Sequence, residues 1–330
     1  MSNNEQPTRS SRRQTDEERD EEQRSGGLVK KIILSIVGVV VLLFVAGAAL
    51  FFYYASSAPK ISQSELASQN GTTIYDSQNR VISRLGLQKR EYAKDSQVPT
   101  TLKHAVVSIE DRRFYKHHGV DPIRIVGAAT ANIFGRSDGM QGGSTLTQQL
   151  VKLSVFSTAA SDRTFKRKAQ EAWLAINVER HFSKNQILDF YINKVYMGNG
   201  VYGMQTAAQY YYGKNLNQLS LSQLALLAGM PQSPTYYNPL STNTQAATRR
   251  RNEVLNAMVR SKYITQAQAD KAAQESITAD LDSSHGNTSN GDVNVDEKVI
   301  DPYIKEVLAD LQSKGYNPYN DGLQVHTNID

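Results

Sequence analysis

One uninterrupted apolar run dominates the pattern of hydrophobic and polar positions. Residues 32–55 carry no charged side chain and are rich in Val, Leu and Phe. A helix of this length crosses about 30 Å of hydrocarbon. Lys30 and Lys31 precede the run, and residues 51–54 (FFYY) form an aromatic belt at its far end. The pattern predicts a transmembrane anchor with a cytoplasmic N-terminus. We prefer it to a cleaved signal peptide because the charged tail before it is long.

The segments on either side of this run differ in pattern. Residues 1–31 are polar, carry both charge signs and lack an apolar period, so we expect a disordered cytoplasmic tail. Residues 56–95 contain two short β-type runs, 72–75 and 80–83, which flank a turn-rich quartet at 76–79. This segment therefore predicts a β-hairpin and linker.

Helical periodicity dominates residues 96–260, which we expect to form one mainly α domain. Capping-box pairs, Ser183 with Gln186 and Ser220 with Gln223, predict two helix starts. Leu226 and Leu227 follow the second box and are expected in the core. A further helix is indicated by the apolar spacing of Leu102, Ala105, Val106 and Ile109.

The last part, residues 261–330, predicts a helical linker and the start of another domain. Residues 283–294 are a polar linker, 299–311 have a helical pattern, and 322–330 have the pattern of a strand. No partner for that strand is evident in the sequence, so we expect it to be poorly ordered.

The composition limits which partners and which catalytic or metal-binding groups the chain can have. The net charge of +5 and the pI of about 9.1 favour anionic partners such as phosphates or anionic lipid. The chain has no Cys, which excludes disulfides, thiolate catalysis and Cys-based zinc sites. No HExxH or comparable spacing is present, so we expect no metal site built from the His residues.

Residues 110–119 (EDRRFYKHHG) form the first of three chemically dense blocks. Glu110 falls near the end of the predicted helix, Gly119 is a plausible stop, and Asp121-Pro122 can cap and start the next helix. A carboxylate on a rigid helix end, ringed by aromatics and cations, suits general acid–base catalysis. A solvated charge cluster is the alternative, which this block alone would favour.

The second block, residues 142–152 (GGSTLTQQLVK), places two glycines before a helix. Ser144 and Thr145 can cap that helix, and its N-terminus favours an anion. It is not a Walker loop, because no Lys directly follows the glycines, so nucleotide binding is poorly supported. We also expect no nucleic-acid partner. The alternative is a flexible turn before an amphipathic helix.

The third block contains Arg163, Arg167, Lys168 and Glu171. The last three share a helix face by their spacing. An acid among cations stays ionised and can help to hold a phosphate or a metal–phosphate pair. An ordinary helix salt-bridge ladder explains the spacing equally well and is the simpler interpretation of this block alone.

Five blocks in order (EDRRFYKHHG, GGSTLTQQLVK, RKAQEAWLAINVE, KNQILDFYIN and RRNEVL) resemble the motifs of family 51 peptidoglycan glycosyltransferases. These are the glycan-polymerising domains of class A penicillin-binding proteins and of monofunctional transglycosylases. The resemblance covers roughly residues 95–260. Val178, Asp189 and Ile192 depart from the usual third and fourth motifs, which affects helix packing and one acidic position.

The resemblance implies a lysozyme-like helical fold with a small membrane-dipping jaw lobe. By resemblance, residues 153–161 belong to that lobe, and Leu153, Val155 and Phe156 are expected at the lipid interface. A disordered loop is the alternative for this stretch.

The resemblance also implies an inverting reaction that joins lipid II units or a growing glycan chain, with Glu110 as general base and Glu171 assisting the leaving group. A divalent cation, Mg²⁺ or Mn²⁺, is implied at the donor pyrophosphate. We expect the two carboxyls to lie farther apart than the roughly 5 Å of retaining glycosidases. The substrate-contacting and site-shaping residues implied are Phe114, His117, Ser144, Gln148, Gln149, Lys152, Arg163, Arg167 and Lys168.

Structural roles are expected for Asn193, Gly198, Asn199, Gly200 and Gly203, which lie in a turn-rich region. Arg250 and Arg251 of the last block can meet phosphate or form helix-face salt bridges, and the sequence does not decide between the two.

No KTG signature of a transpeptidase is present, and the SxxK at residues 57–60 sits beside the anchor. We therefore expect the N-terminal portion of a bifunctional enzyme. Its expected partners are lipid II, the glycan chain, the cytoplasmic membrane and other cell-wall synthesis proteins. A glycan hydrolase is less consistent with the cations at 163–168. A non-catalytic scaffold is less consistent with two intact glutamates.

Overall fold

A computed structural model describes residues 9–63, 66, 72–85, 93–134, 142–156, 164–241, 244–282, 302–314, 316 and 323–329. The chain divides into two compact units, Met1–Ser57 and Ala58–Asp330. The predicted linker at 283–294 and the end of the predicted jaw stretch, 157–161, lie outside the described residues.

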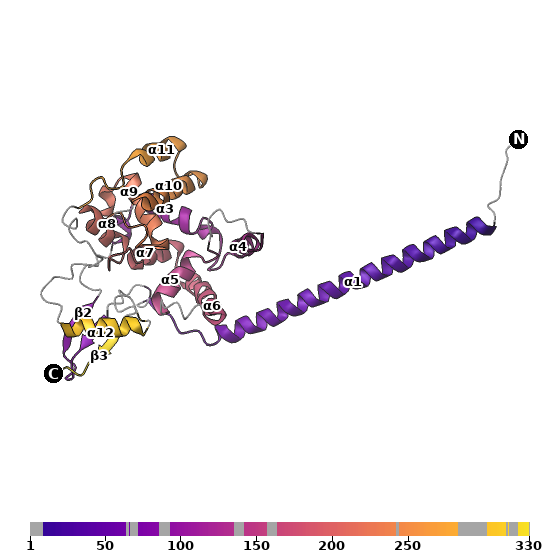
Figure 1. The fold of residues 1–330 in the computed structure, drawn as a ribbon, viewed down its shortest axis with the longest axis horizontal. Coiled ribbons are helices and arrows are strands. Elements are labelled where there is room, and N and C mark those ends of the chain that lie inside the picture. The colour runs from indigo at the N-terminus through magenta and orange to yellow at the C-terminus, as the bar shows by residue number, and fades with distance from the viewer. Residues whose placement is uncertain are drawn as a thin grey trace. The chain divides into compact units, whose positions relative to one another are not determined.

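The first unit is one long helix, α1 (Arg9–Ala55; Figure 1). Its segment Ile33–Ala55 is long and apolar enough to cross a membrane, in agreement with the predicted anchor. The helix begins well before that segment, so the prediction of a disordered tail is wrong from Arg9 onward. Arg, Glu and Gln are strong helix formers, and residues 9–24 are rich in them.

The second unit is mainly helical, as predicted (Figure 1). Short 3₁₀ turns at Asp95–Gln97, Phe114–Lys116, Leu216–Gln218 and Met230–Gln232 join longer helices. These helices are α3 (Thr100–Glu110), α4 (Pro122–Phe134), α5 (Leu146–Val155), α6 (Phe165–His181), α7 (Lys184–Lys194), α8 (Met204–Tyr212), α9 (Leu221–Gly229), α10 (Gln245–Arg260) and α11 (Gln266–Gln274).

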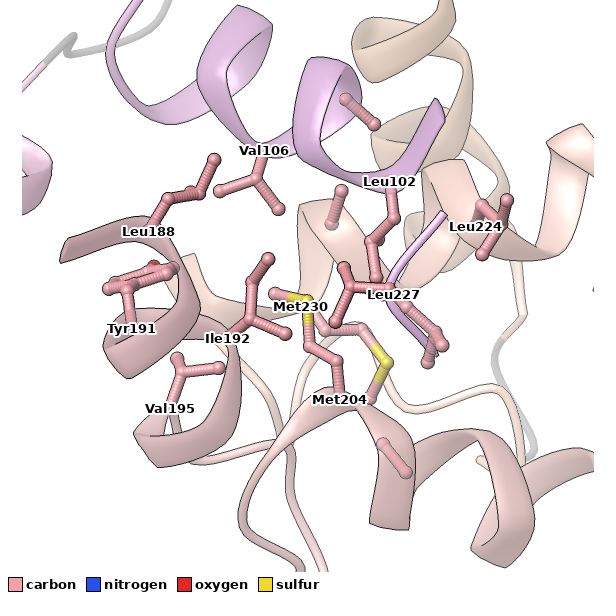
Figure 2. Close-up of a cluster of buried hydrophobic side chains, with 14 of the residues drawn as sticks. Leu102, Val106, Leu188, Tyr191, Ile192, Val195, Met204, Leu224, Leu227 and Met230 are labelled. Carbon is pink, nitrogen blue, oxygen red and sulfur yellow. The ribbon is translucent and has the colours of Figure 1, made fainter. Parts of the chain in front are cut away.

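Helix α9 lies at the centre of the hydrophobic core. Residues 222–229 are all buried, and a helix that is apolar on every side belongs in a protein interior. Figure 2 shows Leu224 and Leu227 of α9 beside side chains of α3, α7 and α8. Leu226 and Leu227 are fully buried, which confirms the prediction for both. The labelled neighbours in this cluster are Leu102, Val106, Leu188, Tyr191, Ile192, Val195, Met204 and Met230.

Capping boxes start several of these helices. The predicted boxes at Ser183 and Ser220 are both present, with each hydroxyl accepting a hydrogen bond from the backbone N–H three residues later. Thr145 starts α5 in the same way. Each such cap is worth about 1 kcal/mol of helix stability.

The helical body extends beyond residue 260, where the sequence placed its boundary. Ala269 and Ala272 of α11 are buried in the main core. Arg251 of α10 is almost fully buried and donates to the carbonyls of Ala272, Ala273 and Glu275 at 3.1, 3.0 and 2.9 Å. Arg251 therefore caps the end of α11, a structural role that is neither the phosphate contact nor the helix-face salt bridge predicted for it.

A small sheet joins the two ends of the second unit. Strands β1 (Thr72–Tyr75) and β2 (Val81–Leu85) form the predicted antiparallel hairpin. Strand β3 (Gln324–His326) pairs with β1 in parallel, so the order is β2-β1-β3. The prediction that the last strand lacks a partner is wrong, because β1 offers it a free edge.

Helix α12 (Pro302–Ser313) packs on this sheet. Ile304 and Leu308 of α12 form a second, separate cluster with Ile74 of β1 and the partly buried Val325 of β3. One apolar residue from each of the two paired strands thus meets one face of the helix, which gives the sheet a small core of its own.

The turn-rich segment after α7 is structural, as predicted. Gly198, Asn199, Gly200 and Gly203 all have positive φ angles, between 50° and 88°. Asn193 accepts from the backbone N–H of Ala93 at 2.8 Å and donates to its carbonyl at 3.1 Å. A Cβ at Gly203 would lie 2.8 Å from the carbonyl oxygen of Asn193, so the close approach requires glycine.

The apolar surface lies on α4 and at the start of α6. Leu153, Val155 and Phe156 are partly buried and pack against the main core, so they are less available to lipid than the sequence predicts. Ile123 and Val126 of α4 are each 62% exposed, and Phe165 of α6 is 89% exposed.

Candidate active site

Glu110 is the last residue of α3 and is nearly buried. Its Oε2 accepts a hydrogen bond from Nε2 of Gln149 at 3.0 Å, and Oε1 of Gln149 lies 3.2 Å from the hydroxyl of Tyr191. Tyr191 of α7 and Gln149 of α5 thus form a line of hydrogen-bonded side chains that ends at the carboxylate of Glu110. The prediction of a carboxylate on a rigid helix end is confirmed.

Arg250 of α10 approaches the other carboxylate oxygen. Its Nη2 lies 3.6 Å from Oε1 of Glu110. The guanidinium is held by the carbonyl of Gly229 at 3.0 Å and by Glu253 at 3.0 Å, and it lies over the ring of Tyr237. A Cβ at Gly229 would come within 2.9 Å of Cγ of Arg250, so this glycine makes room for the arginine.

Arg250 therefore makes the predicted helix-face salt bridge, with Glu253, and in addition an ion pair with the candidate base, which was not predicted. Oε1 of Glu110 is shielded from solvent and makes no hydrogen bond with any side chain in the part of the chain that the structure describes. A buried carboxylate oxygen without a hydrogen bond is costly to leave unsatisfied. Its lone pairs can accept from a hydroxyl once a ligand opens access to this oxygen.

The second carboxylate, Glu171, is fully buried in α6. Arg167 donates to its Oε1 at 3.0 Å, and Nζ of Lys168 lies 2.5 Å from its Oε2. Nζ of Lys168 also lies 3.4 Å from the hydroxyl of Ser144, which precedes α5. The predicted shared helix face is confirmed, and Ser144 joins it. Lys168 is half-exposed, so one cation of the cluster can reach a ligand.

Gly119 lies in the loop after Glu110 and packs against the helix that carries Glu171. Its φ is +88°, and a Cβ there would lie 2.6 Å from backbone atoms of Ala175 and Ile176. The loop that follows Glu110 therefore lies directly against α6, one turn beyond Glu171. The carbonyl of Gly119 also accepts from the hydroxyl of Thr145 at 2.6 Å. The distance between the two carboxyls stays a prediction.

A buried polar network supports the loop from beneath. Asp111 accepts from the backbone N–H of Leu146 at 3.0 Å, and its Oδ2 lies 2.9 Å from Nε2 of His117. Glu179 accepts from the hydroxyl of Thr147 at 2.5 Å and pairs with Lys184 at 2.7 Å. These contacts tie α5, α6 and α7 to the segment after α3.

Phe114 and His117 belong to this support. Phe114 is fully buried, and the ammonium group of Lys184 lies 4.4 Å from its ring centroid. Burial lowers the pKa of Lys184, an effect that the neighbouring Glu179 opposes. His117 is 5% exposed. Both residues can shape the site but offer almost no surface to a substrate.

Helix α5 uses its predicted polar residues in different ways. Gln148 accepts from the backbone N–H of Thr145 at 2.9 Å and so completes the capping box. Gln149, for which a contact with the glycosyl donor was predicted, donates a hydrogen bond to Glu110. Lys152 is half-buried one turn beyond Gln149 on the same face. Arg163 lies outside the described residues.

The sequence analysis assigned no site role to Asp111, Glu179 or Tyr191, and it named Arg250 without its contact to Glu110. All four lie inside the five blocks, so only their position marked them. Tyr191 had only its place on the apolar face of α7, which is also where a core tyrosine lies. Nothing in the spacing of Glu179 separates it from an ordinary surface glutamate.

A protein-built metal centre is absent from the described part of the chain, where no group of three or more His, Asp or Glu side chains is placed to hold an ion. Glu171 alone faces the cationic cluster, and both of its oxygens are already paired with cations. The residues therefore do not fit a resident divalent cation in this arrangement.

Comparisons with known proteins identify the family and relatives of this chain. The transglycosylase family model matches residues 78–259, which is more than half of the chain. Penicillin-binding protein 1A of Streptococcus oralis is 50% identical over 276 residues, covering 83% of this chain and 42% of the relative. Penicillin-binding protein 1A/1B of Bacillus subtilis is 39% identical over 277 residues, covering 83% and 29%.

The chain thus spans less than half the length of these relatives. A crystal structure of penicillin-binding protein 1A from Haemophilus influenzae matches 76% of the chain at 23% identity, with a TM-score of 0.38. The family model covers the helices that carry Glu110, Gln149, Glu171 and Arg250. This chain belongs to the transglycosylase family.

Proposed function

We propose that this chain polymerises lipid II into β-1,4-linked glycan strands, with inversion and release of undecaprenyl pyrophosphate. One observation carries the proposal. Glu110 ends α3, the loop that follows it packs through Gly119 against α6, which carries Glu171, and each carboxylate faces cationic side chains. One carboxylate is thereby placed for proton transfer, and the other lies within a cluster suited to a phosphate.

The proton transfer falls to Glu110. The acceptor's 4-hydroxyl donates to Oε1 of Glu110, its oxygen attacks the anomeric carbon of the donor, and the bond from that carbon to the pyrophosphate breaks. A carboxylate serves as a base only while it is ionised. Gln149 donates a hydrogen bond to one oxygen of this carboxylate, and Arg250 lies beside the other.

The cations of α6 stabilise the negative charge that develops on the departing pyrophosphate. Glu171 fixes Arg167 and Lys168 in place by ion pairs. Lys168 keeps about half of its side chain exposed. Positioned cations that meet charge as it develops lower a barrier most effectively. The resemblance implies a divalent cation here, but both oxygens of Glu171 are paired with cations in this arrangement, and the steps above do not use one.

The lipid-linked substrate fits the surface around the site. Arg124 of α4 donates to the backbone carbonyl of Glu110, so α4 begins at the candidate base. The exposed apolar side chains of α4, Ile123 and Val126, thus lie close in sequence to that contact. We place the lipid-facing surface of the domain here, with α1 as the anchor, a cytoplasmic N-terminus and the site outside.

The test is polymerisation of purified lipid II by the whole chain in detergent, with glycan products separated by size. Glu110→Gln keeps the shape of the side chain and removes its basicity, so we expect polymer from the parent and none from this variant. Glu306→Gln, an exposed glutamate of α12, is the matched control and should keep full activity.

Other outcomes would contradict the proposal in distinct ways. Cleavage of preformed glycan without synthesis would indicate a hydrolase. Lipid II binding without any product, from a parent whose melting is cooperative, would indicate a scaffold. Polymer from Glu110→Gln at the parent's rate would remove Glu110 from the role of base.

A further inference from the structure

Tyr191 is a buried phenol that points at the site from the core. It is fully buried in α7, among the side chains of Figure 2. Its hydroxyl lies 3.2 Å from Oε1 of Gln149. Burial, reinforced by the nearby charge of Glu110, raises the pKa of Tyr191 well above its ordinary value. The phenol therefore always carries a proton that it can donate.

The chemistry of the three groups fixes the direction of the hydrogen bonds. An ionised carboxylate only accepts, whereas an amide offers an N–H₂ donor at one end and an oxygen acceptor at the other. Gln149 must therefore present Nε2 to Glu110, as it does at 3.0 Å. Its oxygen then faces Tyr191, which has to donate. This arrangement offers the Glu110 carboxylate a hydrogen-bond donor, whereas the amide turned the other way would present an oxygen to it.

We propose that Tyr191 is a positioning residue that acts through Gln149 to keep Glu110 in its ionised, base-competent form. The inference rests on the proposed role of Glu110. The hydrogen bond from Tyr191 disfavours the flipped orientation of Gln149, in which the amide oxygen would face Glu110, because the buried phenol would then lose the acceptor that the structure records for its proton. Only a protonated Glu110 can donate to that oxygen, so the flipped amide favours the inactive acid.

The other charged groups around Glu110 do not replace this arrangement. Arg250, from α10, faces Oε1 at 3.6 Å and makes no hydrogen bond with it. Arg124, from α4, donates to the backbone carbonyl of Glu110 and pairs with Asp111 at 3.6 Å. Gln149 is the side chain for which the structure records a hydrogen bond to the Glu110 carboxylate.

Removing the phenol oxygen alone tests this inference. In Tyr191→Phe the ring still fills its place, but Gln149 is free to turn. One neutral hydrogen bond is worth about 1 kcal/mol, which corresponds to a shift of about 0.7 pH units. We expect the acid limb of the pH–rate profile for lipid II polymerisation to move up by about that much. At pH values below the limb, the rate should fall about fivefold.

Tyr211→Phe is the matched control. Tyr211 is also fully buried, and its hydroxyl donates to the carbonyl of Met197 at 2.8 Å, in a different part of the core. We expect this variant to lose stability without any shift of the acid limb. Equal shifts in Tyr191→Phe and Tyr211→Phe, or none in either, would overturn the inference.

A second variant tests the path of the effect. Gln149→Leu removes the donor to Glu110 and should move the acid limb farther than Tyr191→Phe does. The double variant should move it no farther than Gln149→Leu alone, because the phenol acts only through the amide. Additive shifts would show that Tyr191 acts by another route.

An activity-free readout separates this inference from the proposed function. Infrared difference spectra of the whole chain against Glu110→Gln isolate the carboxyl band of Glu110, and its protonation can be followed with pH. If no glycan forms and Tyr191→Phe still moves the midpoint, the proposed function fails and the positioning role stands. If glycan forms and the midpoint does not move, the positioning role fails alone.

Discussion

Gly119→Ala is the substitution for which the structure makes the sharpest prediction. A Cβ at this position would lie 2.6 Å from the backbone carbon of Ala175, whereas ordinary contacts begin at 3.4 Å. The difference of these values, 0.8 Å, is the least distance by which the loop must move away from α6. That backbone cannot give way, because it belongs to the helix that carries Glu171.

Two costs add in this variant. A positive φ costs a non-glycine residue about 1 kcal/mol, and overpacking against a rigid neighbour costs about 1–3 kcal/mol. We expect a loss of about 2–4 kcal/mol, which lowers the melting temperature by roughly 4–16 °C. Displacing a catalytic group by about 1 Å can cost 100-fold in rate, so polymerisation should fall by at least that factor.

Gly213→Ala separates strain from collision. Gly213 also has a positive φ, of +61°, but a Cβ there would meet only a side-chain oxygen of Asp282 at 3.5 Å, an ordinary contact. This control should lose about 1 kcal/mol and keep its activity. The assays are thermal melting and lipid II polymerisation at a temperature at which both variants are folded. Matching losses in the two variants would refute the role assigned to the Gly119 contact.

Three further predictions concern stability. Arg251→Met removes the side-chain donor to three carbonyls at the end of α11 and should cost about 2–4 kcal/mol in denaturant unfolding. Burial lowers the pKa of His104, which stacks on Tyr263; the folded state therefore loses stability as pH falls below the ordinary value of 6.5. His104→Phe should weaken this acid sensitivity in melting scans. Ile74→Ala should speed amide exchange in residues 324–326.

Each of these has an outcome that would count against it. Unchanged unfolding of Arg251→Met would mean that the end of α11 does not depend on this cap. A parent and His104→Phe with parallel pH–stability curves would exclude a contribution from the imidazole. Equal exchange changes in α9 and in the last strand would show that Ile74 supports the whole unit rather than the small sheet.

Helix positions were predictable where one local signal decided them. The boxes at Ser183 and Ser220 and the cap at Asp121 needed only short spacing, and each is present. The pairing of β3 with β1 was not predictable, because a strand three residues long carries no record of its partner. The same holds for α11, whose place depends on a buried arginine in another helix.

The candidate site was likewise predictable from the sequence only in part. The resemblance marked Glu110 and Glu171, and the helical spacing placed Arg167 and Lys168 beside the second of them. The sequence did not reveal that Gln149 donates a hydrogen bond to Glu110. A glutamine at a helix start is equally suited to capping, and the neighbouring Gln148 does cap α5. Contacts between helices depend on the three-dimensional packing, which periodicity does not encode.

The parallel pairing of β1 with β3 has a consequence for the order of events during synthesis. Thr327 and Tyr75, which are bonded at this sheet, are 252 residues apart in the chain. At roughly 5–20 residues per second, a ribosome needs about 13–50 s to make that interval. A two-stranded hairpin is marginally stable by itself, and closing so long a loop costs entropy. The sheet should therefore be the last part of the unit to form, well after the helices around Glu110.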